Sequence, residues 1–171
     1  MEKIEKIKDT KVTMVKDLMQ KDVYSVYVDS TVFEASVLMA SKNIGTLPVV
    51  KRDSKSVDTL IGIINDRDIV TKCVAIGKDP KKTKVCECMT PNPVRIVPSA
   101  TCNDAVRLMS ELHVRRLPVV EKEKLVGIIS LADIASISAS CPNKQFPNPD
   151  CILIDFAKEL GKTASNSKCC S

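Results

Sequence analysis

Apolar and polar residues follow one another in the same order in both halves of the chain. The six apolar, mostly β-branched runs lie at 23–28, 47–50 and 60–64 in the first half and at 94–97, 117–120 and 125–129 in the second. Between the first and second run of each half, apolar residues recur every three or four positions. Short β-branched runs indicate strands, and the three- and four-residue spacing indicates helices. Each half therefore predicts the order strand, helix, strand, strand, helix.

The two halves also match residue by residue, with an offset of 70 residues at first and of 65 later. The positions that recur at the first offset are Val15, Met19, Ala35, Met39, Leu47, Pro48, Val49 and Val50, and those at the second are Gly62, Ile63, Ile64 and Asp68. The change of offset places five extra residues between the second and third run of the first half. A surface hairpin loop absorbs such an insertion at little cost. The pattern therefore predicts two similar units in tandem.

The repeat divides the chain into five segments, which we expect to be a lead at 1–11, a first repeat at 12–77, a linker at 78–84, a second repeat at 85–139 and an extension at 140–171. Each repeat is small for a stable core of its own, which predicts an interface between the two. In the extension, residues 152–160 have the pattern of a short helix, and the small, polar residues that follow predict partial disorder.

Helix starts are marked by polar residues placed three positions apart. Thr31 with Glu34, and Thr101 with Asp104, predict capping boxes at the first helix of each repeat. At the second helix, Asn65 precedes Asp68 and Ser130 precedes Asp133 by the same three positions. This arrangement is a cap in its own right, and its carboxylate can also accept hydrogen bonds from ribose hydroxyls. The two interpretations are compatible, and both stay open.

Arg115 and Arg116 stand directly before the Leu-Pro-Val-Val run of the second repeat, where the first repeat has Gly45 and Thr46. Guanidinium groups at the start of a strand can bind a phosphate, although two solvated arginines explain the same residues. If they bind phosphate, the two repeats cannot offer equivalent sites.

Composition narrows the classes of function. A net charge of +5 arises from 26 basic and 21 acidic residues scattered through the same segments, and the chain has five Phe and Tyr residues and no Trp. This balance and the scarcity of stacking residues argue against a nucleic-acid partner. No run approaches the ~20 apolar residues of a membrane span, and residues 1–11 lack a signal-peptide core. We expect a cytoplasmic protein without a membrane partner.

The chain has eight cysteines and a single histidine, His113. In a cytoplasmic protein these cysteines are expected to be reduced thiols or small core residues, as Cys73 and Cys102 within helical patterns suggest. Cys86 and Cys88 form a C-x-C pair. Structural zinc usually needs two C-x₂₋₄-C pairs or a histidine pair, so we expect no metal site. One histidine and five glycines also leave no catalytic triad and no glycine-rich phosphate loop, so we expect no enzyme.

The ordered set of motifs M-[QT], A-x-x-L-M, L-P-V-V and G-I-I-[NS]-x-x-D occurs twice within residues 12–139. In this order it resembles a tandem pair of CBS domains, often called a Bateman module, here as a stand-alone chain. The resemblance implies an α+β fold in which two β-α-β-β-α repeats pack through their sheets with pseudo-twofold symmetry. It also implies two clefts between the repeats, a homodimer, and adenosine derivatives as ligands.

The resemblance further implies roles for individual residues. Asp68 and Asp133 would hold ribose, Ser130 would contact ribose or phosphate, and Arg115 and Arg116 would meet phosphates. The base pockets would be lined around Val23 and Tyr24 in one cleft and around Pro93 and Val94 in the other. The first repeat departs from the family pattern at Asn65, where a serine or threonine is usual, and Asp66 and Arg67 add charges that the second repeat lacks.

Taken with the resemblance, the sequence predicts a regulatory sensor without catalytic activity. Its ligand would be AMP, ADP or ATP, with S-adenosylmethionine and NAD as second choices, and no cofactor is obligatory. An unidentified protein target would respond to the ligand. The alternative is a dimeric scaffold or interaction protein with empty clefts. Which nucleotide binds, and whether one cleft or both are used, is left open.

Overall fold

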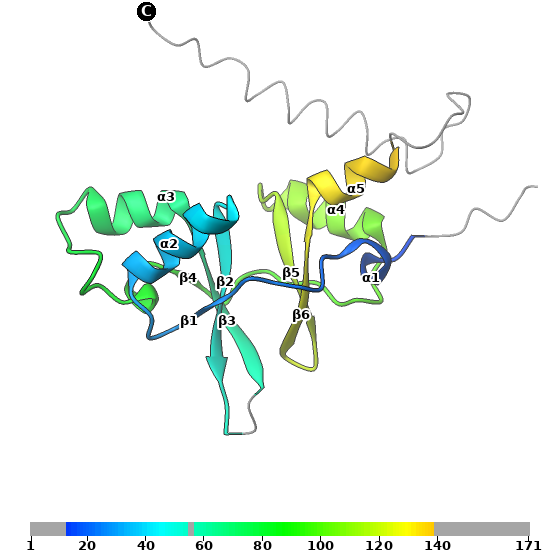
Figure 1. Ribbon diagram of the computed structural model, residues 1–171. Coiled ribbons are helices and arrows are strands. Elements are labelled where there is room, and N and C mark those ends of the chain that lie inside the picture. Colours follow the sequence, from blue (N-terminus) through cyan, green and yellow to red (C-terminus); the bar gives the residue numbers. More distant parts are fainter. Residues whose placement is uncertain (1–12, 55–56, 139–171) are drawn as a thin grey trace, which may run out of the picture.

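The computed structural model describes residues 13–54 and 57–138, which form two similar units side by side (Figure 1). The first unit contains β1 (Val26–Tyr27), α2 (Val32–Lys42), β2 (Thr46–Arg52), β3 (Asp58–Asn65), α3 (Asp66–Ile69) and the π-helical turn η1 (Val70–Val74). The second contains α4 (Cys102–Glu111), β5 (Arg116–Glu121), β6 (Lys124–Ser130) and α5 (Leu131–Ser138). Three short elements precede these units in the chain: α1 (Val15–Leu18) before the first, and the 3-10 turn η2 (Val85–Glu87) and β4 (Thr90–Pro91) before the second.

The predicted α+β fold of two tandem repeats is confirmed. The strands form one sheet in the order β1-β2-β3-β6-β5, with β4 also pairing with β3. Within each unit an antiparallel hairpin dominates, β2 with β3 and β5 with β6. The antiparallel ladder between the two hairpins, formed by β3 and β6, has one residue pair, Thr59 with Lys124. In Figure 1 the helices of each unit lie together at one end of its hairpin.

The predicted helix caps are present. The side chain of Thr31 accepts a hydrogen bond from the backbone N–H of Glu34, and the carboxylate of Glu34 accepts one from the N–H of Thr31. Thr101 and Asp104 make the same reciprocal pair at α4. These bonds satisfy N–H groups that a helix start leaves unpaired. The first repeat's second helix ends near Gly77, whose φ of 73° lies in the left-handed region that glycine adopts without strain.

The first strand of each repeat is shorter than predicted. Residues 23–28 contribute only β1, and residues 94–97 contribute one bridge, between Ile96 and Val119. The reason is a crossing of the chain. Gln20 pairs with Ile128 of the second unit, whereas Val26 pairs with Val49 of the first. The residues between Gln20 and Val26 must therefore pass from one unit to the other, and they cannot all pair with the same strand.

This crossing completes each hydrophobic core with residues from the start of the other repeat. Val15 is fully buried in the core of the second unit, against which Leu18 and Met19 also pack. Val85 and Cys88 are fully buried in the core of the first unit, with Met89 packed against it. In Figure 1, α1 lies beside the second unit, and the chain then runs across to β1. The two repeats are therefore interlocked, which is the shared interface that their small size predicts. None of the helices in the described residues has the length and apolar character needed to cross a membrane.

Two glycines make room for the interlock. A Cβ at Gly127 would lie 2.6 Å from Sδ of Met19 and 3.2 Å from the carbonyl oxygen of Gln20. A Cβ at Gly62 would likewise clash with Sδ of Met89, and it would lie 3.3 Å from the carbonyl oxygen of Thr90. Each glycine thus lets the crossing segment approach the sheet of the opposite unit.

We predict that Gly62→Ala lowers the free energy of unfolding by about 1–3 kcal/mol, because the added methyl group overpacks the contact with Met89. Urea unfolding of the full chain measures this cost. In a Met89→Ala background the same substitution should cost less, since the neighbouring thioether is gone. Additive effects of the two substitutions would show that the glycine and the methionine are not coupled.

Candidate functional site

A cleft of about 60 Å³ lies between the two units, at the point where the chain crosses from one to the other. Its lining consists of Gln20, Asp22, Val23, Tyr24, Ile44, Thr46, Arg116 and Ile128. The crossing segment supplies the first four of these residues. The first residues of β2 and β5, Thr46 and Arg116, contribute the polar groups of the two hairpins. Both repeats therefore build this cleft.

Asp133 belongs to the same region through its contact with Gln20. The Oδ1 atom of Asp133 accepts a hydrogen bond from Nε2 of Gln20, with 3.1 Å between the two atoms. Its Oδ2 atom caps α5 by accepting bonds from the backbone N–H and the hydroxyl of Ser130, at 2.8 Å and 2.6 Å. Ser130 in turn pairs with Arg116 across the hairpin. The capping interpretation of Ser130 and Asp133 is thus confirmed, and one carboxylate oxygen faces the crossing segment.

The two arginines predicted as phosphate ligands are placed differently. Both are exposed, but Arg116 is among the residues that line the cleft and Arg115 is not. The backbone carbonyl of Arg115 accepts a hydrogen bond from the N–H of Leu131. Only Arg116 is therefore positioned to carry positive charge into this cleft.

The residues predicted to line base pockets also fall into two groups. Val23 and Tyr24 line the cleft, and the ring of Tyr24 lies under the ammonium group of Lys42, 4.7 Å from the ring centroid. Pro93 and Val94 are not among its lining residues; they belong to the second crossing segment, between β4 and the bridge at Ile96. Val23, Tyr24 and Arg116 therefore line one cleft. Asp133 and Ser130 are not among its lining residues and are linked to it through the side chain of Gln20. Pro93 and Val94 are not among them either.

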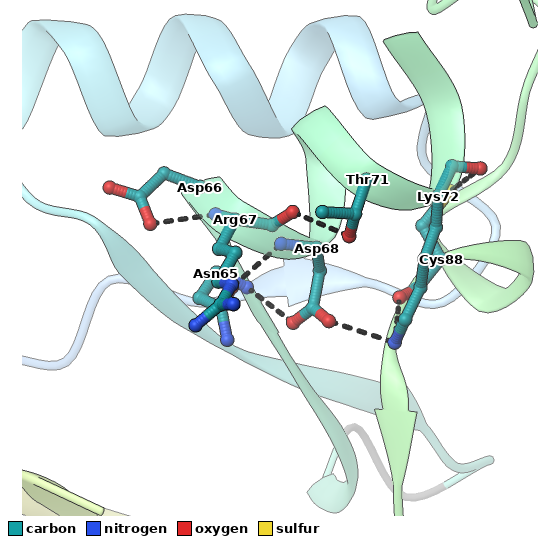
Figure 2. A network of polar contacts seen from close by, with 7 residues as sticks. All are labelled: Asn65, Asp66, Arg67, Asp68, Thr71, Lys72 and Cys88. Atoms are coloured by element: carbon teal, nitrogen blue, oxygen red, sulfur yellow. Dashed lines mark hydrogen bonds and ion pairs between the residues drawn. The ribbon is translucent and has the colours of Figure 1, made fainter. Parts of the chain in front are cut away.

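Asp68 and Asn65 form a separate network in the first repeat (Figure 2). The N–H of Asn65 donates to Oδ2 of Asp68 at 3.2 Å, and the N–H of Asp68 donates to Oδ1 of Asn65 at 2.7 Å. The other carboxylate oxygen, Oδ1, forms an ion pair with Nζ of Lys72 at 2.8 Å. Nζ of Lys72 also donates to the carbonyl oxygen of Cys88 at 3.0 Å. Asp68 is only 9% exposed, so this carboxylate is tied into the protein.

Asp66 and Arg67 are the charged residues that the second repeat lacks at this motif. The carboxylate of Asp66 accepts a hydrogen bond from the N–H of Arg67 at 2.7 Å. Its Oδ2 atom also lies 2.9 Å from the position that a Cβ on Gly45 would take. Glycine at this position therefore leaves room for the Asp66 carboxylate.

A larger groove, of about 450 Å³, lies between α2 and α3 of the first unit and was not predicted from the sequence. It is lined by Ser36, Met39, Ala40, Asn43, Ile44, Gly45, Asp66, Ile69 and Val70. Of its lining residues, Val70 is an apolar residue that stays exposed. The groove opens on the helical side of the first unit.

Cys73, Cys86 and Cys88 are free thiols. Cys73, Cys88 and Cys102 are buried, as predicted for Cys73 and Cys102, whereas Cys86 is exposed. Burial raises the pKa of the Cys88 thiol above its ordinary value. Within residues 13–54 and 57–138, no group of three or more histidine, cysteine or acidic side chains is arranged to hold a metal ion.

Comparisons with known proteins agree with this architecture. The family model of the CBS domain matches residues 15–75 and again 85–140. Uncharacterized protein YlbB of Bacillus subtilis (strain 168) is 39% identical over 123 residues, which are 72% of this chain and 80% of YlbB. The chain belongs to the CBS-domain family, and it carries the domain as a tandem pair.

Three related proteins of known structure are similar to this chain in fold and sequence. Hypoxic Response Protein I with two coordinated zinc ions matches with a TM-score of 0.65 and 34% identity, over 72% of this chain and 98% of its own. The CBS domain pair of protein MJ0100, in complex with 5′-methylthioadenosine and S-adenosyl-L-methionine, matches with a TM-score of 0.63 and 27% identity, over 75% and 98%. A hexameric CBS-CP12 protein from bloom-forming cyanobacteria matches with a TM-score of 0.64 and 30% identity, over 91% and 90%.

Proposed function

We propose that this chain is a regulatory module without catalytic activity that binds an adenosine nucleotide in the cleft between its two repeats. The observation that supports this most directly is the meeting of Arg116, Tyr24 and the Gln20–Asp133 contact around one cleft. These groups supply a cation, an aromatic ring and a carboxylate, which match the phosphate, base and ribose of a nucleotide. The adenosine ligands of the MJ0100 pair support the same chemical class.

In this proposal each group has one task. Asp133 accepts hydrogen bonds from the ribose hydroxyls, and Ser130 contacts the ribose or a phosphate. The guanidinium of Arg116 binds a phosphate, which favours AMP, ADP or ATP over S-adenosylmethionine, a ligand without phosphate. Val23 and Tyr24 line the base pocket. Asp68, Asn65, Pro93, Val94 and Arg115 are not among the residues that line this cleft and have no task in it.

The cleft must widen to admit such a ligand. Its volume of about 60 Å³ is far below the ~300–1,000 Å³ of typical ligand pockets. Gln20 and Tyr24, which line it, are both exposed and can move without opening a core. Because residues of both repeats line the cleft, a ligand that fills it would favour one arrangement of the two repeats. A protein target would respond to that change, by no more than the difference in ligand affinity between the two states. The proposal places the module in the cytoplasm, where its free cysteines stay reduced.

We expect AMP, ADP or ATP to raise the unfolding temperature of the purified, reduced protein in a thermal shift measurement. A ligand at about 100 times its Kd stabilises the folded state by about 2.7 kcal/mol. Arg116→Ala should weaken phosphorylated ligands about 10- to 100-fold, because a charge-assisted hydrogen bond is lost. Arg107→Ala is the matched control, since Arg107 is exposed on α4 and pairs with Asp104. Equal losses from both variants would remove Arg116 from the site, and the absence of any shift across the nucleotides would contradict the proposal.

A second candidate function is a dimeric scaffold with empty clefts. It is favoured by exposed apolar side chains on the helices of the first unit, Phe33 and Val37 on α2 and Val70 and Val74 on the second helix. At the positions equivalent to Phe33 and Val37, the second repeat carries Asn103 and Arg107. The fold therefore does not require apolar residues at these two positions, whereas an interface between two chains does. A homodimer through this surface is also compatible with ligand binding in the cleft.

We predict that the chain sediments as a dimer, twice its mass of 18.7 kDa, and that Val37→Arg shifts it toward monomer. A charge placed in an apolar interface should weaken the dimer about 10-fold or more. Val97→Arg provides the control, because Val97 and Val37 are both 50% exposed. Sedimentation equilibrium distinguishes the outcomes. A monomeric wild-type protein, or equal effects of the two variants, would contradict this interface.

A further inference from the structure

The two aspartates that end the repeated motif are held by different partners. One oxygen of each carboxylate caps its own helix, by accepting from the N–H of Asn65 or of Ser130. The remaining oxygen accepts from the neutral amide of Gln20 at Asp133, and from the ammonium group of Lys72 at Asp68. The repeats are therefore unequal at the atom that would meet a ribose.

At Asp68 this oxygen is blocked by a strong interaction. The carboxylate is 9% exposed, and its partner Lys72 has a second hydrogen bond, to the carbonyl oxygen of Cys88 in the buried part of the first unit. A ribose that displaced the ammonium group would break a partly buried ion pair and leave a backbone carbonyl without this partner. Neutral hydroxyls do not compensate for such a loss.

At Asp133 the corresponding oxygen is blocked only weakly. Gln20 is exposed, and its amide is a neutral donor, as a ribose hydroxyl is. The backbone of Gln20 is held independently, by two hydrogen bonds with Ile128. The side chain can thus swing away while the crossing segment stays in place, and its departure also removes atoms from the lining of the cleft.

The two partner residues, Lys72 and Gln20, each occur in one repeat only. The offset of 65 residues relates Lys72 to Ile137, which has no charge, and the offset of 70 relates Gln20 to Thr90, which has no amide. The difference between the two aspartates is therefore a property of the chain and not of one side-chain orientation.

We propose that the cleft beside Gln20 and Asp133 holds the only ribose site among the described residues of the two repeats. The amide of Gln20 occupies this site when no ligand is bound and competes with the ligand, and Asp68 is a structural carboxylate. This inference rests on the proposed function. It adds that one ligand binds per chain and that Gln20 sets the affinity.

Isothermal titration calorimetry of the full chain with AMP, and in a parallel series with ATP, tests the inference. We expect one ligand per chain. Gln20→Ala should tighten binding about 2- to 10-fold, the value of one neutral hydrogen bond. Asp68→Asn should leave both Kd and stoichiometry unchanged, whereas Asp133→Asn should weaken binding at least about 10-fold. Asp104→Asn is the control for a capping carboxylate, because Asp104 caps α4 with the same bonds and its other oxygen pairs with Arg107 instead of a residue that lines the cleft.

A stoichiometry of two ligands per chain would overturn the single ribose site. A higher Kd of the Asp68→Asn variant would overturn it as well. Unchanged or weaker binding by Gln20→Ala would overturn its role as a competitor. Gln20→Ala removes no backbone hydrogen bond, so it carries the test even if Asp68→Asn fails to fold, which urea unfolding of each variant reveals. If neither nucleotide binds the wild-type chain or Gln20→Ala, the proposed function itself fails. That outcome is distinct from binding with the wrong stoichiometry.

Discussion

The structure depends on one exchange of packing between its repeats. Met19, which precedes the first repeat's strands, packs on the sheet of the second unit beside Gly127, and Met89 packs on the sheet of the first unit beside Gly62. Each contact is possible because the glycine has no Cβ. Since each core is completed from outside its own repeat, neither small unit can be separated from the other without exposing apolar surface to water.

The same exchange creates the cleft. A chain that leaves the second unit at Gln20 and joins the first at Val26 must pass between them, and its side chains line the space that remains. Polar groups from both hairpins meet there because β2 and β5 begin at the same junction, with Thr46 and Arg116. A site built in this way is sensitive to the relative position of the repeats. That property suits a regulatory module, and it follows from the packing alone.

Periodicity and local capping made much of this fold predictable. The tandem repeat, the two hairpins and the caps at Thr31 and Thr101 depend on neighbours in the sequence, and the structure contains them. The short first strands were mispredicted because the pairing of Gln20 with the opposite unit depends on tertiary structure. The partners of Asp68 and Asp133 were hidden for a similar reason. Lys72 stands four residues after Asp68, a helical spacing that hinted at the ion pair, but Gln20 is 113 residues away from Asp133. The difference between Arg115 and Arg116 arises because β5 begins at Arg116, and Arg115 lies in the bend before it.

The most direct test of this account is a crystal structure of the chain grown with saturating AMP. The account predicts one nucleotide per chain between the crossing segment and β5. Its ribose hydroxyls would lie within hydrogen-bond distance of the Asp133 carboxylate, in place of the Gln20 amide, and its phosphate would lie beside Arg116. A nucleotide bound at Asp68, or in the groove between α2 and α3, would contradict the account. So would a ribose bound at Asp133 while the amide of Gln20 keeps its place.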